Sequence, residues 1–157
     1  MVAQELKLLI TIDIFEVSIM KGLTIKEISV GDSASFTKTV TEADITLFAG
    51  FSGDFNPAHI NETEAKAGMF GKRIAHGMLS AGFISTVLGM KLPGPGTIYM
   101  GQELRFVKPV YIGDTVTATC TVTERIEEKN RLKLETVVTN QNGDAVITGV
   151  ATVMPPK

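Results

Sequence analysis

With 15 basic and 17 acidic residues among 157, the chain has a formal net charge of −2, which argues against the basic patch of a nucleic-acid-binding protein. A chain of this length fits one domain, and a domain of about 150 residues buries roughly 70% of its unfolded surface without help from disulfides or metals. The single cysteine, Cys120, excludes an intrachain disulfide and a cysteine-based zinc site, so we expect a cytoplasmic protein without a bound metal.

Residues 1–19 are apolar enough to raise the question of a signal peptide or a membrane span. Asp13 and Glu16 interrupt this segment, it lacks a basic start and a small-residue cleavage site, and it is too short to cross a bilayer. We therefore expect neither, and no association with membranes. Alternating isoleucines favour an additional strand at Ile10, Ile12 and Ile14. We predict an N-terminal extension over residues 1–19 and a single domain over residues 20–157.

Short elements are predicted in the first half of this domain. An extended lead that ends in a Gly-Asp turn is predicted over residues 25–32, followed by a strand over residues 34–40. Thr41 and Asp44 form a capping signal before an apolar pattern, which predicts a helix over residues 42–51. A second short helix is predicted over residues 62–67, where Asn61 can serve as the cap.

The segment Ser52–His59, with the sequence Ser-Gly-Asp-Phe-Asn-Pro-Ala-His, carries the densest turn signal. Its turn formers are Gly53, Asn56 and Pro57. They predict an ordered loop that holds both Asp54 and His59.

Residues 75–90 form the longest apolar segment and contain no charged residue. A helix with this composition is expected to be buried on essentially all sides. Small side chains step by four residues along one stripe, at Gly77, Ala81, Ser85 and Gly89. Such a stripe predicts close approach by a strand, a partner helix or a ligand, and packing is the more common cause.

Strands and turns are predicted for the rest of the chain. The strands span residues 97–107, 115–126, 132–139 and 145–154. Two of them alternate in polarity, which indicates one buried face, at Val116, Ala118, Cys120, Val122, Leu132, Leu134, Thr136 and Val138. The simplest arrangement is an α+β fold in which a curved antiparallel sheet packs against one buried helix.

Asp54 and His59 allow two interpretations. In the structural one, Asp54 forms an Asx turn with a nearby backbone amide and His59 is a partly buried polar residue. In the functional one, the carboxylate and the imidazole share one water molecule, in an arrangement that Asn56 and Pro57 could shape. Such a pair can act as base and acid near neutral pH.

His76, Gly77 and Ser85 are equally ambiguous. In one interpretation, His76 serves only as the cap of the long helix. The N–H of Gly77 lies where the first amides of a helix have no internal partner, so it could stabilise a developing oxyanion. Ser85 is about 12 Å further along the helix and cannot bind the same ligand atom as Gly77. It could support the Asp-His pair, line a pocket or bond back to the helix carbonyls.

Four segments carry a resemblance to a known family. They are Ser52–His59, the run Ile-Ala-His-Gly-Met-Leu at residues 74–79, and the segments Leu-Pro-Gly-Pro-Gly-Thr-Ile-Tyr and Phe-Val-Lys-Pro-Val-Tyr-Ile-Gly-Asp that begin at Leu92 and Phe106. Together they resemble the hydratase-2 signature of MaoC-like, (R)-specific enoyl-CoA hydratases of the PhaJ type. The resemblance spans about residues 23–154, and the Asp-x-Asn-Pro-x-His core shows no departure from it.

The resemblance implies a hot-dog fold, with the sheet wrapped around the long apolar helix, and a homodimer or dimer of dimers. It implies reversible (R)-specific hydration of trans-2-enoyl-CoA to (R)-3-hydroxyacyl-CoA without a cofactor. In the family's pattern, Asp54 and His59 are the catalytic pair, the amide of Gly77 polarises the thioester, and a family serine falls on Ser85. Asn56 and His76 are expected to support the site.

Other functions stay open at this point. One is another thioester enzyme on the same fold, either a dehydratase that acts on acyl carrier protein or a thioesterase. Another is a non-catalytic acyl-CoA-binding module, which the intact Asp-His pair disfavours. The sequence does not identify the carrier or the acyl-chain length, and Lys72, Arg73 and Lys108 are only weak candidates for contacts with the CoA phosphates.

Overall fold

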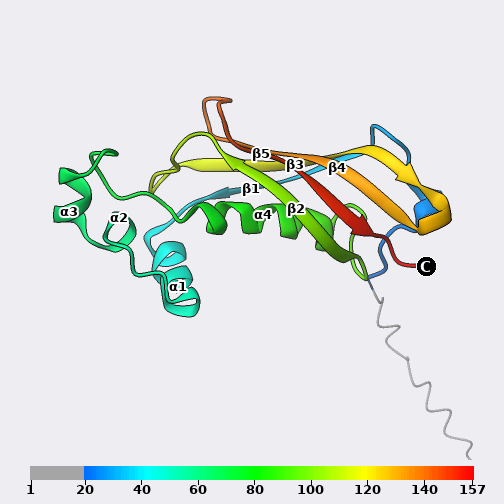
Figure 1. Cartoon of the computed structure of the whole chain (residues 1–157), viewed down its shortest axis with the longest axis horizontal. Coiled ribbons are helices and arrows are strands. Elements are labelled where there is room, and N and C mark those ends of the chain that lie inside the picture. Colours follow the sequence, from blue (N-terminus) through cyan, green and yellow to red (C-terminus); the bar gives the residue numbers. More distant parts are fainter. Residues whose placement is uncertain (1–19) are drawn as a thin grey trace, which may run out of the picture.

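A computed structural model describes residues 20–157, which form one five-stranded antiparallel sheet with a helix along one face (Figure 1). The order of the strands across the sheet is β1-β3-β4-β5-β2. The strands are β1 (Ser33–Thr39), β2 (Ile98–Phe106), β3 (Thr115–Ile126), β4 (Arg131–Thr139) and β5 (Ala145–Met154). This architecture confirms the α+β hot-dog prediction, and β1 and β2 are the two edges of the sheet.

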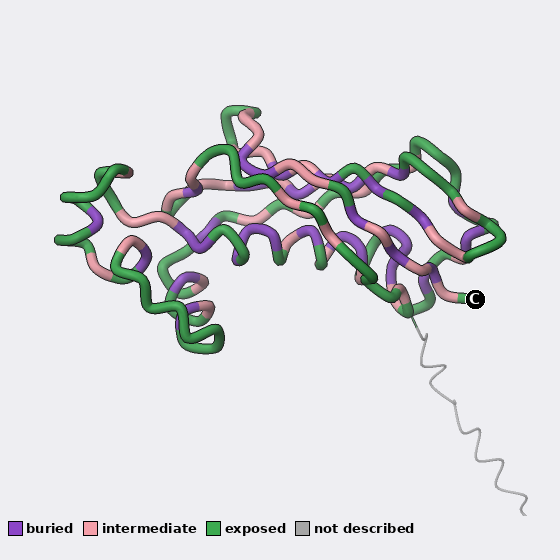
Figure 2. The backbone as a smooth tube through the Cα atoms, viewed as in Figure 1, coloured by how far each residue is buried: buried purple, intermediate pink, exposed green. Residues whose placement is uncertain are grey.

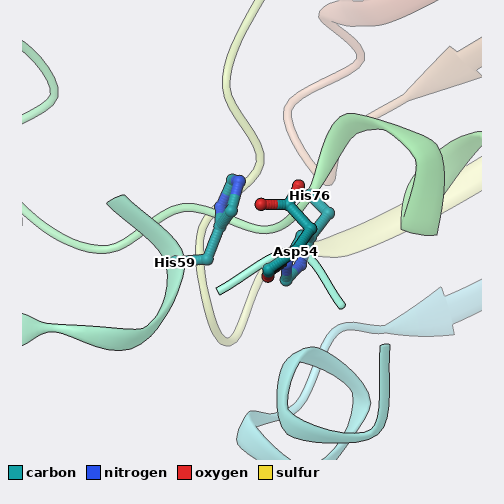
Figure 3. Close-up of side chains that lie close together, drawn as sticks. All are labelled: Asp54, His59 and His76. Atoms are coloured by element: carbon teal, nitrogen blue, oxygen red, sulfur yellow. Dashed lines mark hydrogen bonds between the residues drawn. The ribbon is translucent and has the colours of Figure 1, made fainter. Parts of the chain in front are cut away.

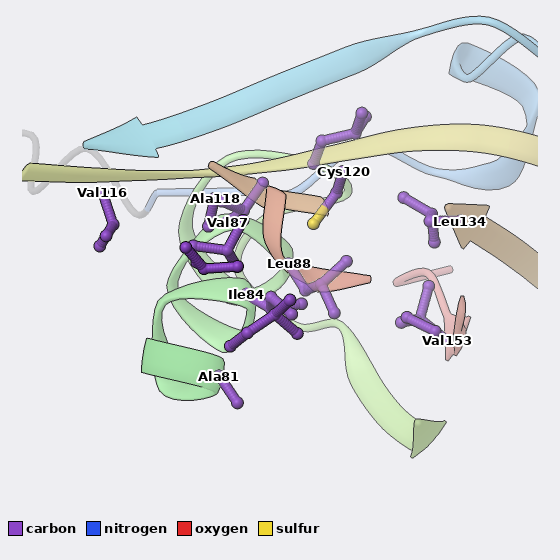
Figure 4. Packing of buried hydrophobic residues seen from close by; sticks show 14 of the residues in the cluster. Ala81, Ile84, Val87, Leu88, Val116, Ala118, Cys120, Leu134 and Val153 are labelled. Carbon is purple, nitrogen blue, oxygen red and sulfur yellow. The ribbon is translucent and has the colours of Figure 1, made fainter. Parts of the chain in front are cut away.

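The inner face of the sheet is built by the alternation that the sequence predicted. Along β4 and along β3 as far as Val122, every second side chain is buried, including Cys120 and Leu134. Helix α4 (Gly77–Met90) packs against this face through Ile84, Val87 and Leu88 (Figure 4). Full burial of an aliphatic side chain contributes about 1.5–3 kcal/mol, so this layer anchors α4 firmly to the sheet.

One expectation about α4 is wrong. The helix is buried on one face only, and its outer face includes the exposed residues Met78, Gly82 and Ser85 (Figure 2). The lack of charged residues therefore does not reflect burial within a single chain. Of the predicted stripe, Ala81 is buried, whereas Gly77 and Ser85 are exposed.

Three short helices project together from one end of the sheet (Figure 1). They are α1 (Glu42–Ser52), α2 (Pro57–Ile60) and α3 (Glu62–Ala67). The predicted capping box of α1 is present, since the Thr41 hydroxyl accepts from the Asp44 N–H and the Asp44 carboxylate accepts from the Thr41 N–H at 2.8 Å. The predicted cap of α3 is also confirmed, because the Asn61 side chain accepts from two backbone amides.

The lead before β1 differs from its prediction. Residues Ile25–Glu27 form a 3₁₀ helix, η1, because Glu27 accepts from the Thr24 N–H at 2.8 Å and closes a capping box. The predicted strand within residues 1–19 lies outside the described residues. Among residues 20–157, none of the helices combines the length and hydrophobicity that a membrane span requires.

Candidate active site

The loop that carries Asp54 follows directly from the end of α1. Gly53 ends the helix in the left-handed conformation (φ 77°), and its N–H bonds back to the carbonyl of Ala49. One carboxylate oxygen of Asp54 accepts from the N–H of Asn56 at 3.2 Å. The structural interpretation of Asp54, an Asx turn, is therefore correct, and the second carboxylate oxygen is left for other partners.

The position of His59 corrects the prediction of a loop. Asn56 and Pro57 start the one-turn helix α2, since the Asn56 side chain accepts from the Ala58 N–H at 3.0 Å and Pro57 occupies the first helical position. His59 is on this turn and is only 8% exposed. Asn56 thus acts on the site through the helix that it caps, and its own side chain is exposed.

A backbone carbonyl fixes the orientation of the His59 ring. Nδ1 of His59 lies 2.8 Å from the carbonyl oxygen of Ile74, and the N–H of Ile74 in turn donates to the carbonyl of Ala58 at 3.1 Å. A carbonyl oxygen can only accept a hydrogen bond, so Nδ1 carries the hydrogen. The other ring nitrogen, Nε2, consequently has the free lone pair that a general base needs.

His76 lies directly against His59 (Figure 3). The two rings stack with centroids 3.8 Å apart and an interplanar angle of 29°. Although His76 is at the N-cap position of α4, its side chain makes no capping hydrogen bond. Nε2 of His76 instead lies 2.9 Å from the main-chain oxygen of Asp54. The idea that His76 only caps the helix is therefore wrong.

The three side chains are also close enough together to hold a metal ion. One ligand atom from each of Asp54, His59 and His76 lies within 4.8 Å of the others. The geometry of the rings does not fit a metal. A histidine nitrogen binds an ion in the plane of its ring, and two stacked, nearly parallel rings cannot direct their lone pairs at one ion. The cluster is suited to hydrogen bonding.

Gly77 begins α4 at the edge of the same site. Its N–H finds no hydrogen-bond acceptor among the described residues, as expected for the first amide of a helix. The ring of Phe106 covers its Cα so closely that a Cβ at this position would lie 2.8 Å from the ring. Glycine therefore fits beneath the Phe106 ring, and a larger residue would require this exposed ring to shift.

A cavity of about 560 Å³ joins these groups. Asp54, His59, His76 and Gly77 all line it. Most of the remaining wall is apolar, with Phe48, Phe70, Ile74, Met78, Phe106 and Ile147 among its residues. An apolar pocket with a few convergent polar groups is the usual form of a small-molecule site.

Ser85 does not line this cavity. It borders a separate groove of about 410 Å³ between the outer face of α4 and the edge strand β2. Met78 and Phe106 line both spaces and so mark the boundary between them. Ser85 is thus too far along the helix to contact the Asp-His pair directly.

Sequence reasoning did not identify Ser80. This serine lines the same cavity, is 1% exposed, and its Oγ has no hydrogen-bond partner in the described part of the chain. Its position three residues after Gly77 places it on the same side of a helix, which is the signal that could have revealed it.

The candidate phosphate ligands are engaged elsewhere. Arg73 forms a bidentate pair with Glu42 and a further bond to Glu62, and the hydrogen bond with Glu42 raises the pKa of the guanidinium. Lys72 lies 4.0 Å above the ring centroid of Tyr111. Lys108 lines the cavity but pairs with Asp144 at 2.8 Å.

Comparison with known proteins identifies relatives over most of the chain. Residues 24–144 match the model of the MaoC like domain. The chain is 58% identical over 131 residues to an (R)-specific enoyl-CoA hydratase of Rhodospirillum rubrum, covering 83% of this chain and 90% of the relative. A second (R)-specific enoyl-CoA hydratase, from Aeromonas caviae, is 40% identical over 85% of this chain and all of the relative. The structure is similar to unliganded R-hydratase PhaJ1 of Pseudomonas aeruginosa, with a TM-score of 0.82, 44% identity and 87% of each chain covered.

Proposed function

The chain belongs to the MaoC-like family, and on this premise we propose that it is an (R)-specific enoyl-CoA hydratase. The enzyme adds water reversibly to the double bond of a trans-2-enoyl-CoA and forms an (R)-3-hydroxyacyl-CoA. The observation that carries the proposal is the convergence of Asp54, His59 and the free amide of Gly77 on one apolar cavity.

In the proposed mechanism, Asp54 and His59 activate one water molecule. Both the free carboxylate oxygen and Nε2 of His59 can accept from its O–H bonds. As the water oxygen bonds to C3, one of its protons passes to the pair and the electrons of the double bond move towards the thioester oxygen. A proton from the pair then adds to C2, so that the net change is the addition of one water molecule.

Gly77 is assigned to the thioester oxygen. This oxygen gains negative charge when the electrons move away from C3, and an N–H at the start of a helix stabilises such charge. The positive end of the α4 dipole lies at the same place and acts in the same direction. The apolar wall excludes water and strengthens both interactions.

We further propose that two copies form a homodimer through β2, and that the protein works in the cytoplasm. Strand β2 is an edge of the sheet, and several of its large apolar residues are exposed: Ile98, Tyr99, Met100 and Phe106. The exposed apolar face of α4 lies beside this edge. An unprotected apolar edge strand is suited to pairing with a second chain. Light scattering should give twice the 16.9 kDa chain mass, and a monomer would contradict the dimer.

The supporting role of Ser85 remains a prediction. It borders the groove outside the cavity, so it can contact an acyl tail or the second chain but not the reacting atoms. A supporting role for Ser85 therefore depends on what fills that groove.

Hydration of crotonyl-CoA with chiral analysis of the product tests the proposal. We expect the (R)-3-hydroxy product, and a product of (S) configuration would contradict the assignment. A parallel assay with crotonyl thioester on acyl carrier protein distinguishes the hydratase from a carrier-protein dehydratase. Release of free thiol without hydration would indicate a thioesterase, and binding without turnover a non-catalytic module.

A further inference from the structure

We infer that His76 is a positioning residue that holds Asp54 and His59 in place, and that the two stacked histidines have opposite neutral tautomers. The catalytic consequence of this inference rests on the proposed function. The tautomers themselves can be measured without an activity assay.

The first contact of His76 is with the loop that carries Asp54. Nε2 of His76 lies 2.9 Å from the main-chain oxygen of Asp54, 22 positions away in the sequence. The other hydrogen bonds of Asp54 reach only Ser52 and Asn56, two residues away on either side, at 3.2 Å each. Among the described residues, His76 is therefore the side chain that ties this exposed loop to α4.

The second contact of His76 is with the ring of His59. The stacked rings are 3.8 Å apart between centroids, and Phe48 of α1 packs on His76 at 4.7 Å. His76 itself is only 2% exposed. A ring enclosed in this way has little freedom to rotate, so it provides a fixed surface against which His59 is held.

The acceptors determine which nitrogen of each ring carries the hydrogen. His59 donates from Nδ1 to the carbonyl of Ile74, whereas His76 donates from Nε2 to the carbonyl of Asp54. Nδ1 of His76 is buried and has no partner in the described part of the chain, so a hydrogen there would be a buried donor without an acceptor. The two neighbouring imidazoles thus have opposite tautomers, and His59 has its lone pair on Nε2.

The two contacts of His76 can be separated by substitution. His76→Phe keeps an aromatic ring for stacking but removes the donor to Asp54. His76→Gln keeps a donor at a similar distance from the backbone but removes the ring. The loss of the donor should matter more, because His59 is also held by Ile74, whereas the Asp54 loop has no other hydrogen bond to a distant residue in the described range 20–157.

We expect kcat of His76→Phe to fall about 100-fold and that of His76→Gln less than about 10-fold, because a displacement near 1 Å can cost about 100-fold in rate. KM should change little in both variants, since neither change removes an assigned substrate contact. A residue that served stability alone would lower the amount of folded enzyme and leave kcat per folded molecule unchanged. Wild-type kcat in folded His76→Phe would overturn the inference.

Nitrogen-15 NMR provides the independent test. The chain has 2 histidines, so the histidine spectrum of the wild-type protein is simple, and His76→Gln assigns it. We expect the hydrogen on Nδ1 of His59 and on Nε2 of His76. The same tautomer in both rings would overturn the inference even if neither variant folds. If the wild-type protein does not hydrate crotonyl-CoA, the proposed function fails, and the spectrum still decides the arrangement of the rings.

Discussion

The ring of Phe106 occupies the space that a side chain at Gly77 would need. A Cβ at Gly77 would lie 2.8 Å from Cε1 of Phe106. This contact joins the end of β2 to the first residue of α4, at the boundary between the proposed active-site cavity and the groove along the helix. The same amide is the proposed donor to the thioester oxygen, so packing and catalysis both constrain this position.

We expect Gly77→Ala to lower kcat/KM about 100-fold, comparable to the loss of one oxyanion donor, because the methyl group prevents close approach to the N–H. Steady-state kinetics with crotonyl-CoA measures the effect. The double variant Gly77→Ala/Phe106→Ala removes the clash but keeps the methyl group. Recovery of wild-type activity in the double variant would show that the clash alone caused the loss.

Asp54→Asn and His59→Gln should each lower kcat at least 100-fold, because each removes one partner of the proposed acid-base pair. Circular dichroism and thermal melting should show that both variants stay folded. Asp32→Asn is a matched control, since the Asp32 carboxylate also accepts from a turn amide, that of Ser29, but does not line the cavity. Near-normal activity in folded Asp54→Asn or His59→Gln would contradict the assignment.

Arg73 ties the helices around the site together. It bonds Glu42 of α1 and Glu62 of α3, and it precedes Ile74, whose carbonyl orients His59. Loss of a partly exposed ion pair costs about 1 kcal/mol. We therefore expect Arg73→Met to lower the melting temperature by about 3 °C. Calorimetry checks this, and an unchanged melting temperature would show that the cluster adds no stability.

The pH dependence of this cluster has a definite sign. The hydrogen bond from Arg73 lowers the pKa of the Glu42 carboxyl in the folded protein. The stability that this ion pair contributes is present above the pKa of Glu42 in the unfolded chain. It is lost as the pH falls through the pKa of Glu42 in the folded protein. The difference in unfolding free energy between wild type and Glu42→Gln should therefore be present at pH 7 and vanish once the pH falls below the lowered pKa of Glu42. Urea unfolding measures it, with the exposed Glu128→Gln as the control.

Ser80→Ala should raise stability. The buried Oγ of Ser80 has no hydrogen-bond partner among the described residues, and an unsatisfied buried polar group costs about 1–3 kcal/mol. Alanine is also the better helix former. We expect the melting temperature to rise by a few degrees, at about 2–4 °C per kcal/mol. A fall would show that the hydroxyl is satisfied in solution, and a higher KM would show that it contacts the substrate.

Local chemistry made much of this structure predictable. The Thr41–Asp44 capping box and the Asn61 cap each involve neighbours in the sequence, so the residue types suffice to predict them. The same holds for the Asx turn of Asp54. The alternation along β3 and β4 determines which side chains are buried, because successive residues of a strand face opposite sides.

The sequence by itself thus determined most of the elements, the buried face of the sheet and the placement of Asp54 and His59 in one short segment, although it did not predict η1 or α2. Only the tertiary structure decided how His59 and His76 are oriented, because their hydrogen bonds reach carbonyls 15 and 22 positions away. It also decided that one face of α4 is exposed, since a single sheet covers a helix on one side only. Periodicity describes one element at a time, whereas these features depend on what another element places against it.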